Sequence, residues 1–389
     1  MDFDALPLTP TEPQYGTGAL SDILPSVLSL LDVPGETDRL GLSAELAGVR
    51  RVGVLLVDGL GRQLYPVAAT ASPVIGDALA GRYGTLRRLT TGFPSTTPTS
   101  LVSLGTGAPP GEHGVLGFTV NLPGTDRVLT HILWGEEPDP MDWQPLRTCF
   151  ERGAAAGVAC SVVSRIYPST GLSRAAFRGG RQIDATGGAE VVTGMRKAMA
   201  EGDRSLVYGY FPHVDKMGHE HGVGSDAWLT AVGDLDTVLG DLTADLPPDS
   251  AIIVTADHGM INVADSDRID VAADPRLRDG VRVIAGEPRA RYVHTEPGAT
   301  ETVTRTWRRT LGDRAIVATR DEAIAAGWFG TVPAAHTDRI GDLIVIGRER
   351  TVLVNVPEAD GPVTALLRGY HGATTEAELA IPLLTVRGG

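Results

Sequence analysis

The sequence predicts an α/β fold with a central, mostly parallel sheet flanked by helices, and a smaller α+β cap insertion. Two observations support this prediction. Short, dense apolar runs alternate with segments whose apolar residues repeat with a helical period. Beyond Asp265 the composition becomes more polar, and a second alternation of short strand-like and helix-like segments begins. Strands that are apolar on both faces belong to parallel sheets covered by helices on each side.

The four apolar runs have strand length and are rich in β-branched residues and leucine. They are VGVLLVDG (52–59), ACSVVS (159–164), SLVYGYF (205–211) and AIIVTAD (251–257). Helices are expected to begin near Thr97, Gly187 and Ser225. The last helix has the clearest period, with apolar residues at Leu229, Val232, Leu235, Val238, Leu239 and Leu242.

Two stretches depart from this alternation. Residues 121–143 are rich in proline, glycine and aspartate, which indicates a long loop or a small lid. Trp134 and Trp143 of this loop are expected either to anchor it or to stack on a ligand ring. Residues 280–330 have a β-α-β-α order of their own and are predicted to form the cap insertion. Residues 1–279 and 331–389 then form the catalytic core.

The bulk composition excludes several classes of protein. The chain has 389 residues and a net charge of −14, which argues against binding to a nucleic-acid polymer. Its two cysteines have no metal-site or disulfide spacing. No apolar run is long enough to span a membrane, and the N-terminal residues do not resemble a signal peptide. A cytoplasmic location is therefore expected, and the sequence carries no signal for the oligomeric state.

Acidic and imidazole side chains follow three of the predicted strands. In open α/β sheets the carboxyl ends of the strands carry the ligand site, so these side chains are expected to converge. They are Asp58, Asp215, His219, Asp257 and His258, and His371 near the C-terminus is a further candidate. Each residue alone could be a turn or cap residue. Oxygen and nitrogen ligands without cysteine suit zinc, manganese or iron.

A hydroxyl-rich segment, TGFPSTTPTSLVSLGTG (91–107), precedes a helical pattern. Pro98 suits the first helical position, which would make Thr97 the N-cap. A helix N-terminus favours a phosphate anion, and a hydroxyl bound to a metal there ionises readily and becomes a nucleophile. Ser95 and Thr96 remain rival nucleophiles at this point.

Five motifs together carry a resemblance to a known family. LLVDGLG, FPSTTPTSLVSLGTG, HVDKMGHEHG, TADHGM and GYHG lie in this order between residue 50 and residue 385. The set resembles the alkaline phosphatase superfamily and, within it, the type I phosphodiesterase/nucleotide pyrophosphatase family. The resemblance covers most of the chain.

The resemblance implies a role for each matching residue. Asp58, Thr97, Asp257 and His258 match the positions around one metal, and Thr97 matches the nucleophile. Asp215, His219 and His371 match the ligands of a second metal. The family usually uses two zinc ions, and some relatives use manganese, iron or calcium. The implied reaction proceeds through a phospho-threonine, with two metals holding the attacking and leaving oxygens.

The sequence departs from the family pattern in two places. Thr97 is followed by Pro98 where the family has an aromatic residue, and Phe118 lies near the register of a phosphate-holding Asn. Asn121 is the nearest substitute for that Asn, and Arg289 and Arg291 of the insertion are further candidates for phosphate contact. Because of these departures, the family's nucleotide preference carries over poorly.

The function expected from these residues is hydrolysis of a phosphodiester or pyrophosphate bond in a small molecule. A phosphomonoesterase on the same core is the alternative, because the groups that contact the non-transferred oxygens separate the two. A catalytically inactive metal-binding module is a remote alternative, since such proteins normally lack a ligand or the nucleophile, and both are present here.

Overall fold

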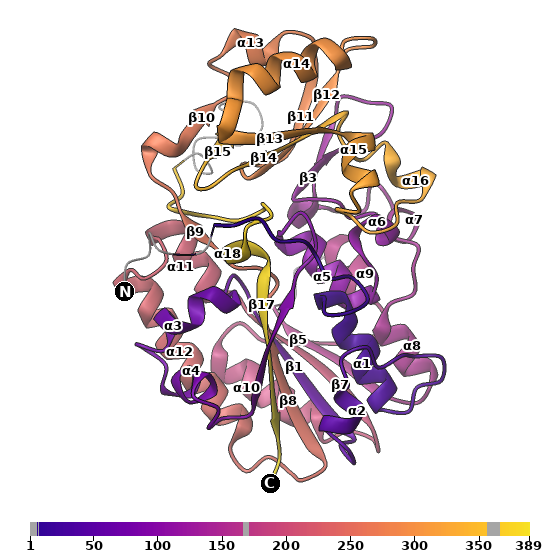
Figure 1. Cartoon of the computed structure of the whole chain (residues 1–389). Coiled ribbons are helices and arrows are strands. Elements are labelled where there is room, and N and C mark those ends of the chain that lie inside the picture. The colour runs from indigo at the N-terminus through magenta and orange to yellow at the C-terminus, as the bar shows by residue number, and fades with distance from the viewer. Residues whose placement is uncertain (1–5, 7, 166–170, 356–365) are drawn as a thin grey trace.

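The computed structural model describes residues 6, 8–165, 171–355 and 366–389, and its largest element is a seven-stranded sheet (Figure 1). In spatial order its strands are β2 (Thr85–Thr90), β17 (Ala380–Arg387), β8 (Ser250–Thr255), β1 (Arg51–Val57), β7 (Ser205–Phe211), β5 (Ala159–Ser164) and β6 (Arg181–Asp184). Strand β17 runs antiparallel to both of its neighbours, and the other pairs are parallel. The predicted central, mostly parallel sheet is therefore confirmed.

Both faces of this sheet are buried under helices. Along β1, Val54 and Leu56 belong to one apolar cluster, whereas Leu55 and Val57 belong to a second cluster on the opposite face. The first cluster includes side chains of α1 (Ile23–Leu30), α5 (Thr97–Thr106), α8 (Cys149–Ala155) and α9 (Gly171–Phe177). The second includes side chains of α3 (Tyr65–Ala68), α4 (Pro73–Leu79), α10 (Gly188–Met199) and α12 (Asp226–Thr243). Successive side chains of a strand alternate between faces, which explains the continuous apolar runs in the sequence.

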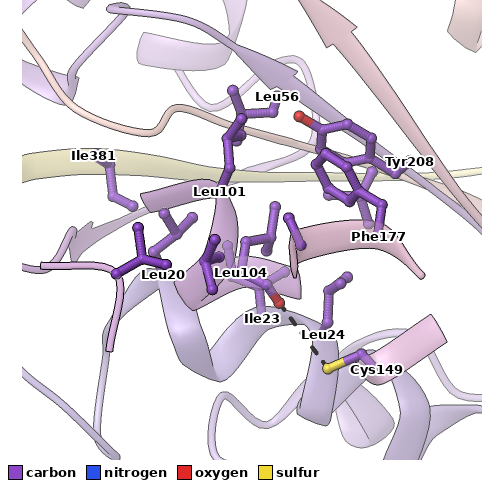
Figure 2. Packing of buried hydrophobic residues seen from close by; sticks show 14 of the residues in the cluster. Leu20, Ile23, Leu24, Leu56, Leu101, Leu104, Cys149, Phe177, Tyr208 and Ile381 are labelled. Carbon is purple, nitrogen blue, oxygen red and sulfur yellow. Dashed lines mark hydrogen bonds between the residues drawn. The ribbon is translucent and has the colours of Figure 1, made fainter. Parts of the chain in front are cut away.

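Helix α5 is held deep in the first cluster (Figure 2). Leu101 and Leu104 of α5 lie among Ile23 and Leu24 of α1 and residues of the sheet. The Cys149 thiol lies 4.0 Å from the Leu104 carbonyl oxygen. These packed side chains therefore hold α5 and its first residue, Thr97, in place.

The N-cap predicted for this helix is wrong by one residue. Thr97 is the first residue of α5, and Thr96 is the N-cap with extended backbone angles and no side-chain cap bond. Pro98 therefore occupies the second helical position, where its missing N–H also costs no intrahelical hydrogen bond.

A second, antiparallel sheet of four strands lies at the other end of the molecule (Figure 1). Its order is β11 (Val281–Glu287), β12 (Ala290–Thr295), β14 (Leu343–Gly347) and β13 (Ala315–Thr319). With α14 (Thr300–Leu311) it encloses its own apolar cluster around Trp307. Strand β14 comes from the interval assigned to the core, so we propose a C-terminal boundary for the insertion beyond Gly347. The division into core and cap stays a prediction.

Further short helices and strand pairs complete the described fold. The helices are α2 (Leu42–Glu45), α6 (Pro110–His113), α7 (Pro140–Trp143), α11 (His213–His221), α13 (Pro275–Arg278), α15 (Arg320–Ala325), α16 (Ala334–Thr337) and α18 (Glu376–Leu379). Three small strand pairs join β3 (Thr119–Asn121) to β4 (Val128–Thr130), β9 (Ile261–Asn262) to β16 (Gly369–Tyr370), and β10 (Arg268–Asp270) to β15 (Val352–Val354).

The predicted loop at residues 121–143 contains β4 and α7, and its tryptophans are buried. The Trp134 indole donates a hydrogen bond to the Pro138 carbonyl, and the Trp143 indole donates one to His131 Nε2. These contacts support the anchoring role rather than a ligand-stacking role.

Among the described residues, no helix is both long enough and apolar enough to cross a bilayer. The cytoplasmic location expected from the sequence stays a prediction.

Candidate metal centre

One group of potential ligands forms where β1 and β8 end side by side in the large sheet. Asp58 follows β1, and Asp257 and His258 follow β8. Their ligand atoms lie within 4.8 Å of one another, and the three residues are buried. His258 Nε2 lies 3.6 Å from Asp58 Oδ1 and 3.3 Å from Asp257 Oδ2. Parallel pairing of the two strands therefore produces the convergence predicted from the sequence.

A second group forms between α11 and the residue after β16. Asp215 and His219 lie one helical turn apart on α11, so that their side chains share one face. His219 Nε2 lies 3.4 Å from Asp215 Oδ2 and 3.2 Å from His371 Nε2. These three residues also place one ligand atom each within 4.8 Å of the others.

The two groups are immediate neighbours. The rings of His258 and His371 stack with centroids 3.6 Å apart and an interplanar angle of 14°. Gly59 permits the close approach of the turn after β1 to helix α11. It has a φ of 72°, and a Cβ there would lie 2.8 Å from Asp215 Oδ1. The ligand sets therefore form one continuous site.

The three imidazoles share one hydrogen-bonding arrangement. Nδ1 of His219 lies 2.8 Å from the Gly369 carbonyl oxygen, and Nδ1 of His371 lies 2.8 Å from that of Ser95. Nδ1 of His258 lies 3.0 Å from the carbonyl oxygen of Gly259. Because a carbonyl oxygen only accepts, each Nδ1 carries the proton and donates it, which leaves the Nε2 lone pair free for a metal.

Burial keeps the imidazoles of His258 and His371 neutral. It lowers the pKa of His258 to about 3, and burial together with His258 and His219 holds the pKa of His371 well below its usual value. Neutral imidazole is the form that binds a metal.

Burial has the opposite effect on the carboxyl groups. It raises the pKa of Asp215 to about 6, an effect that His219 partly offsets. Burial and the neighbouring Asp257 and Asp215 raise the pKa of Asp58 well above its usual value, and burial also raises the pKa of Asp257. Carboxylates crowded together away from water are costly unless a cation compensates them.

The donor set fits divalent ions. Asp58 Oδ1, Asp215 Oδ1 and Asp257 Oδ2 are buried without a hydrogen-bond partner among the described residues. Two ring nitrogens, Nε2 of His219 and Nε2 of His371, face each other at 3.2 Å. A cation in each group would satisfy both the orphaned oxygens and the facing lone pairs, and mixed oxygen and nitrogen ligands suit zinc.

Thr97 stands at the edge of the first group. Its Oγ1 lies 3.2 Å from His258 Nε2. The side chain is partly exposed, whereas its rivals Ser95 and Thr96 are fully buried. Ser95 Oγ is also engaged, because it donates to the Ala373 carbonyl at 2.8 Å. The geometry therefore favours Thr97 as the hydroxyl that a substrate can reach.

Comparison with known families places this site in context. The sequence profile described as "Type I phosphodiesterase / nucleotide pyrophosphatase" matches residues 52–374, most of the chain. The chain belongs to this family. Family membership makes it a hydrolase acting on phosphoric ester bonds, and it confirms the resemblance drawn from the five sequence motifs. No curated protein matches the chain.

Several solved structures are similar to this phosphodiesterase-family chain. Murine ectonucleotide pyrophosphatase/phosphodiesterase 5 has a TM-score of 0.67 at 17% identity, over 86% of this chain and 87% of that one. The human protein of the same name has a TM-score of 0.64 at 16% identity, over 86% and 87%. Phosphonoacetate hydrolase from Sinorhizobium meliloti has a TM-score of 0.63 at 20% identity, over 87% and 90%. At these identities the likeness supports the alkaline-phosphatase-like fold.

The structure gives Arg289 a different partner from the phosphate expected at the sequence level. Its side chain is fully buried and forms a two-pronged ion pair with Glu378, with Nε–Oε1 and Nη2–Oε2 distances of 2.9 and 2.7 Å. Its Nη1 donates to the Thr351 carbonyl. These contacts occupy the guanidinium edges that would bind a phosphate.

Arg291 and Asn121 are buried as well. Arg291 donates from Nε to the Leu353 carbonyl at 2.8 Å. Asn121 Oδ1 has no hydrogen-bond partner among the described residues, and Asn121 pairs with Val128 in the β3–β4 hairpin. A substrate contact by either residue stays a prediction.

Two residues beside the candidate metal centre were not singled out by the sequence reasoning. The Tyr210 hydroxyl donates to Asp58 Oδ2. Tyr210 lies opposite Leu56 in the β1–β7 register, so a polar tip at the carboxyl end of a parallel strand was the available signal. Glu287, at the end of β11, lies against Gly372, and burial raises its pKa to about 8. Its position depends on how the small sheet meets the core, which the sequence does not encode locally.

Proposed function

We propose that this chain hydrolyses a phosphodiester or pyrophosphate bond of a small molecule, with Thr97 as the nucleophile. The reaction depends on two divalent metal ions, and zinc is the expected metal. Manganese, iron or calcium are the alternatives that the superfamily suggests. In this proposal Asp58, Asp257, His258 and Thr97 hold one ion, and Asp215, His219 and His371 hold the other. The substrate is a small phosphoester rather than a nucleic-acid polymer.

One observation carries the proposal. A partly exposed hydroxyl, Thr97 Oγ1, lies at the first residue of a ten-residue helix and 3.2 Å from Nε2 of a buried imidazole in a three-ligand group. The first turn of a helix leaves backbone N–H groups free, so an anionic phosphoryl group is favoured at this place. The nucleophile and an anion-binding helix end therefore coincide with the candidate metal centre.

The chemistry divides into two displacements at phosphorus. In the first, Thr97 Oγ1 forms a bond to phosphorus as the bond to the leaving oxygen breaks, and the leaving group takes up a proton. In the second, a water oxygen attacks phosphorus, the bond to Oγ1 breaks, and the threonine hydroxyl is restored. When bound, divalent ions would lower the pKa values of the threonine hydroxyl and of the attacking water, and they would neutralise charge on the phosphoryl oxygens.

The chain's own residues hold this geometry. The Ser95, Gly259 and Gly369 carbonyls fix the three imidazole rings, and Tyr210 fixes the Asp58 carboxylate. Such partners of metal ligands set ring orientation and ligand basicity.

The ligands named with the similar structures favour small substrates. The murine protein has also been solved with AMP as a variant described as inactive through a threonine-to-alanine substitution. The Sinorhizobium hydrolase has been solved with phosphonoacetate and with phosphonoformate. By analogy, we expect the present site to accept a small phosphorus-containing anion.

The test is a side-by-side assay of purified, zinc-loaded protein on bis-p-nitrophenyl phosphate and p-nitrophenyl phosphate, with metal content measured on the same sample. We expect faster cleavage of the diester at about two metals per chain. Faster cleavage of the monoester would replace the proposal by the phosphomonoesterase alternative. Bound metal without turnover of either compound would favour the inactive binding module.

A further inference from the structure

A buried ion pair joins the small sheet to the large one. Arg289, in the turn between β11 and β12, and Glu378, in α18, are both fully buried. Two hydrogen bonds of 2.9 and 2.7 Å link the guanidinium to both carboxylate oxygens. Arg289 Nη1 also donates to the Thr351 carbonyl at 2.5 Å, so the arginine is fixed from the side of the small sheet. Paired in this way, neither charge is left uncompensated.

The carboxylate of Glu378 also holds the loop that carries His371. Its Oε1 accepts a hydrogen bond from the Ala373 N–H at 3.0 Å, two residues after His371. Its Oε2 accepts one from the Thr375 hydroxyl at 2.6 Å. Both oxygens therefore bridge Arg289 and this loop.

The backbone of Glu378 holds the loop that carries His258. Its carbonyl oxygen accepts a hydrogen bond from the Gly259 N–H at 2.8 Å, and Gly259 is the residue directly after His258. Glu378 thus contacts the chain next to both members of the stacked pair, His258 and His371. These two imidazoles belong to different ligand groups.

Ser95 binds the segment after His371 from the side of Thr97. The Ser95 hydroxyl donates to the Ala373 carbonyl at 2.8 Å and accepts from the Gly372 N–H at 3.1 Å. The segment after His371 is therefore clamped between Ser95, two residues before Thr97, and Glu378. A displacement of Glu378 would be transmitted to the imidazoles through these short hydrogen bonds.

We propose that Glu378, held in place by Arg289, is a positioning residue that sets the metal affinity of both ligand groups. The inference rests on the proposed function, because it concerns the metals assigned there. It predicts that the turn between β11 and β12 tunes the metal centre through one ion pair, although neither Arg289 nor Glu378 is a ligand.

The informative variant replaces both partners, Arg289→Met with Glu378→Leu. Replacing a buried ion pair by apolar residues of similar volume is often neutral for stability, whereas removing one partner leaves a buried charge. The double variant also removes the acceptors for Ala373 N–H and Thr375 Oγ1. The control is Arg308→Gln with Glu322→Gln, which removes a half-exposed ion pair between α14 and α15.

Three quantities are measured for each protein: zinc affinity by competition with a chromogenic chelator, the visible spectrum of the cobalt-substituted protein, and the melting temperature without metal. We expect zinc affinity to fall about 10- to 100-fold in the Arg289/Glu378 variant and to stay near wild type in the control. A changed cobalt spectrum would show that the ligand geometry has moved, which a purely structural ion pair would not cause.

Two outcomes would overturn the inference, and they are distinguishable. Wild-type zinc affinity and an unchanged cobalt spectrum in a folded double variant would show that the pair only stabilises the fold. Absence of zinc binding to the wild-type protein would instead remove the metals of the proposed function, and this inference with them. If the double variant does not fold, Arg289→Gln with Glu378→Gln gives the same decision, because it removes both charges together and leaves neither of them buried without a partner.

Discussion

At the scale of single residues, the hydrogen bonds and the burial of the candidate ligands favour a bound cation. Each imidazole donates a hydrogen bond through Nδ1 to a backbone carbonyl. The buried carboxylate oxygens that have no hydrogen-bond partner among the described residues belong to the same two ligand groups. The types and positions of these residues were predictable because they follow strand ends. Their protonation was not predictable, since it depends on burial by residues distant in the chain.

Arg289 shows the limit of residue-level prediction. An arginine in the predicted cap insertion suggested a phosphate contact. Instead, Nε and Nη2 of Arg289 bind the carboxylate of Glu378, which lies 89 positions away. Residues so far apart in sequence meet only through the fold. The pairing therefore follows from how the two sheets meet rather than from any local pattern.

The first prediction concerns the pH dependence of metal binding in the Asp215 group. The Asp215 pKa is raised to about 6, whereas His371 stays neutral because its pKa is well below the usual value. Protonated Asp215 cannot bind a cation, so zinc affinity should be constant above pH 7 and fall as the pH drops below about 6. The fall should approach about tenfold per pH unit for the one proton displaced.

Calorimetric titrations with zinc in two buffers of different ionisation enthalpy would measure both the affinity and the proton release. An affinity that does not change between pH 7 and pH 5 would show that Asp215 is not a ligand.

At the scale of elements, the strands of the large sheet were the most predictable. Strands β5 and β7 have the bounds of the apolar runs at 159–164 and 205–211, because burial on both faces requires such runs. The position of β14 in the small sheet was not predictable, since strand order is set by tertiary contacts. The N-cap of α5 was displaced by one residue, as helix ends depend on backbone angles that several hydroxyl residues accept.

The second prediction concerns the close packing of the turn after β8. A Cβ at Gly259 would lie 2.0 Å from the Ala377 carbonyl oxygen, a backbone atom of α18 that cannot move freely. Gly259→Ala should therefore lower the free energy of unfolding by about 1–3 kcal/mol, as over-packing does elsewhere. Because the clash adjoins His258, zinc affinity should fall as well.

Gly240→Ala is the matched control for this substitution. Gly240 lies in helix α12 with no atom within 4 Å of its added Cβ, so alanine should stabilise the protein by about 0.5–1 kcal/mol. Chemical denaturation of both variants gives the comparison. Equal stabilities for Gly259→Ala and wild type would contradict the packing described at this turn.

At the scale of the whole molecule, the two sheets lie at opposite ends (Figure 1) and share one apolar cluster, which includes Leu56 of β1 and Tyr292 and Ile344 of the small sheet. The large sheet supplies Asp58, Asp257 and His258, and the turn after β11 approaches the loop of His371 through Glu287 and Arg289. The fold class was predictable from the alternation of apolar runs, whereas the division into two units stays a prediction. The contact between the two sheets was not predictable, because it depends on side chains that are distant in the sequence and share one buried cluster.

The third prediction is that metal removal destabilises the whole molecule. Without a cation, Asp58 and Asp257 are buried together at high cost, and a ligand that binds only the folded state stabilises it by mass action. Zinc at 100 times its dissociation constant should add about 2.7 kcal/mol per site.

The measurement is a set of melting curves for protein treated with a chelator and then titrated with zinc. Asp257→Asn is the matched variant, since it keeps the side-chain size and removes one ligand charge. A melting temperature that does not respond to zinc in the wild-type protein would contradict a metal centre at this position.

The central claim is that Thr97 attacks phosphorus, and the most direct test is to trap the covalent product. Zinc-loaded protein is mixed with bis-p-nitrophenyl phosphate, quenched in acid within milliseconds to seconds, digested, and analysed by mass spectrometry. We predict a p-nitrophenyl phosphoryl group on Thr97 and none on Ser95 or Thr96. We also expect Thr97→Ala to fold and still bind zinc through the remaining carboxylate and imidazole ligands, to show no adduct and to lose turnover. Turnover retained by Thr97→Ala, or an adduct on Thr96, would contradict the account.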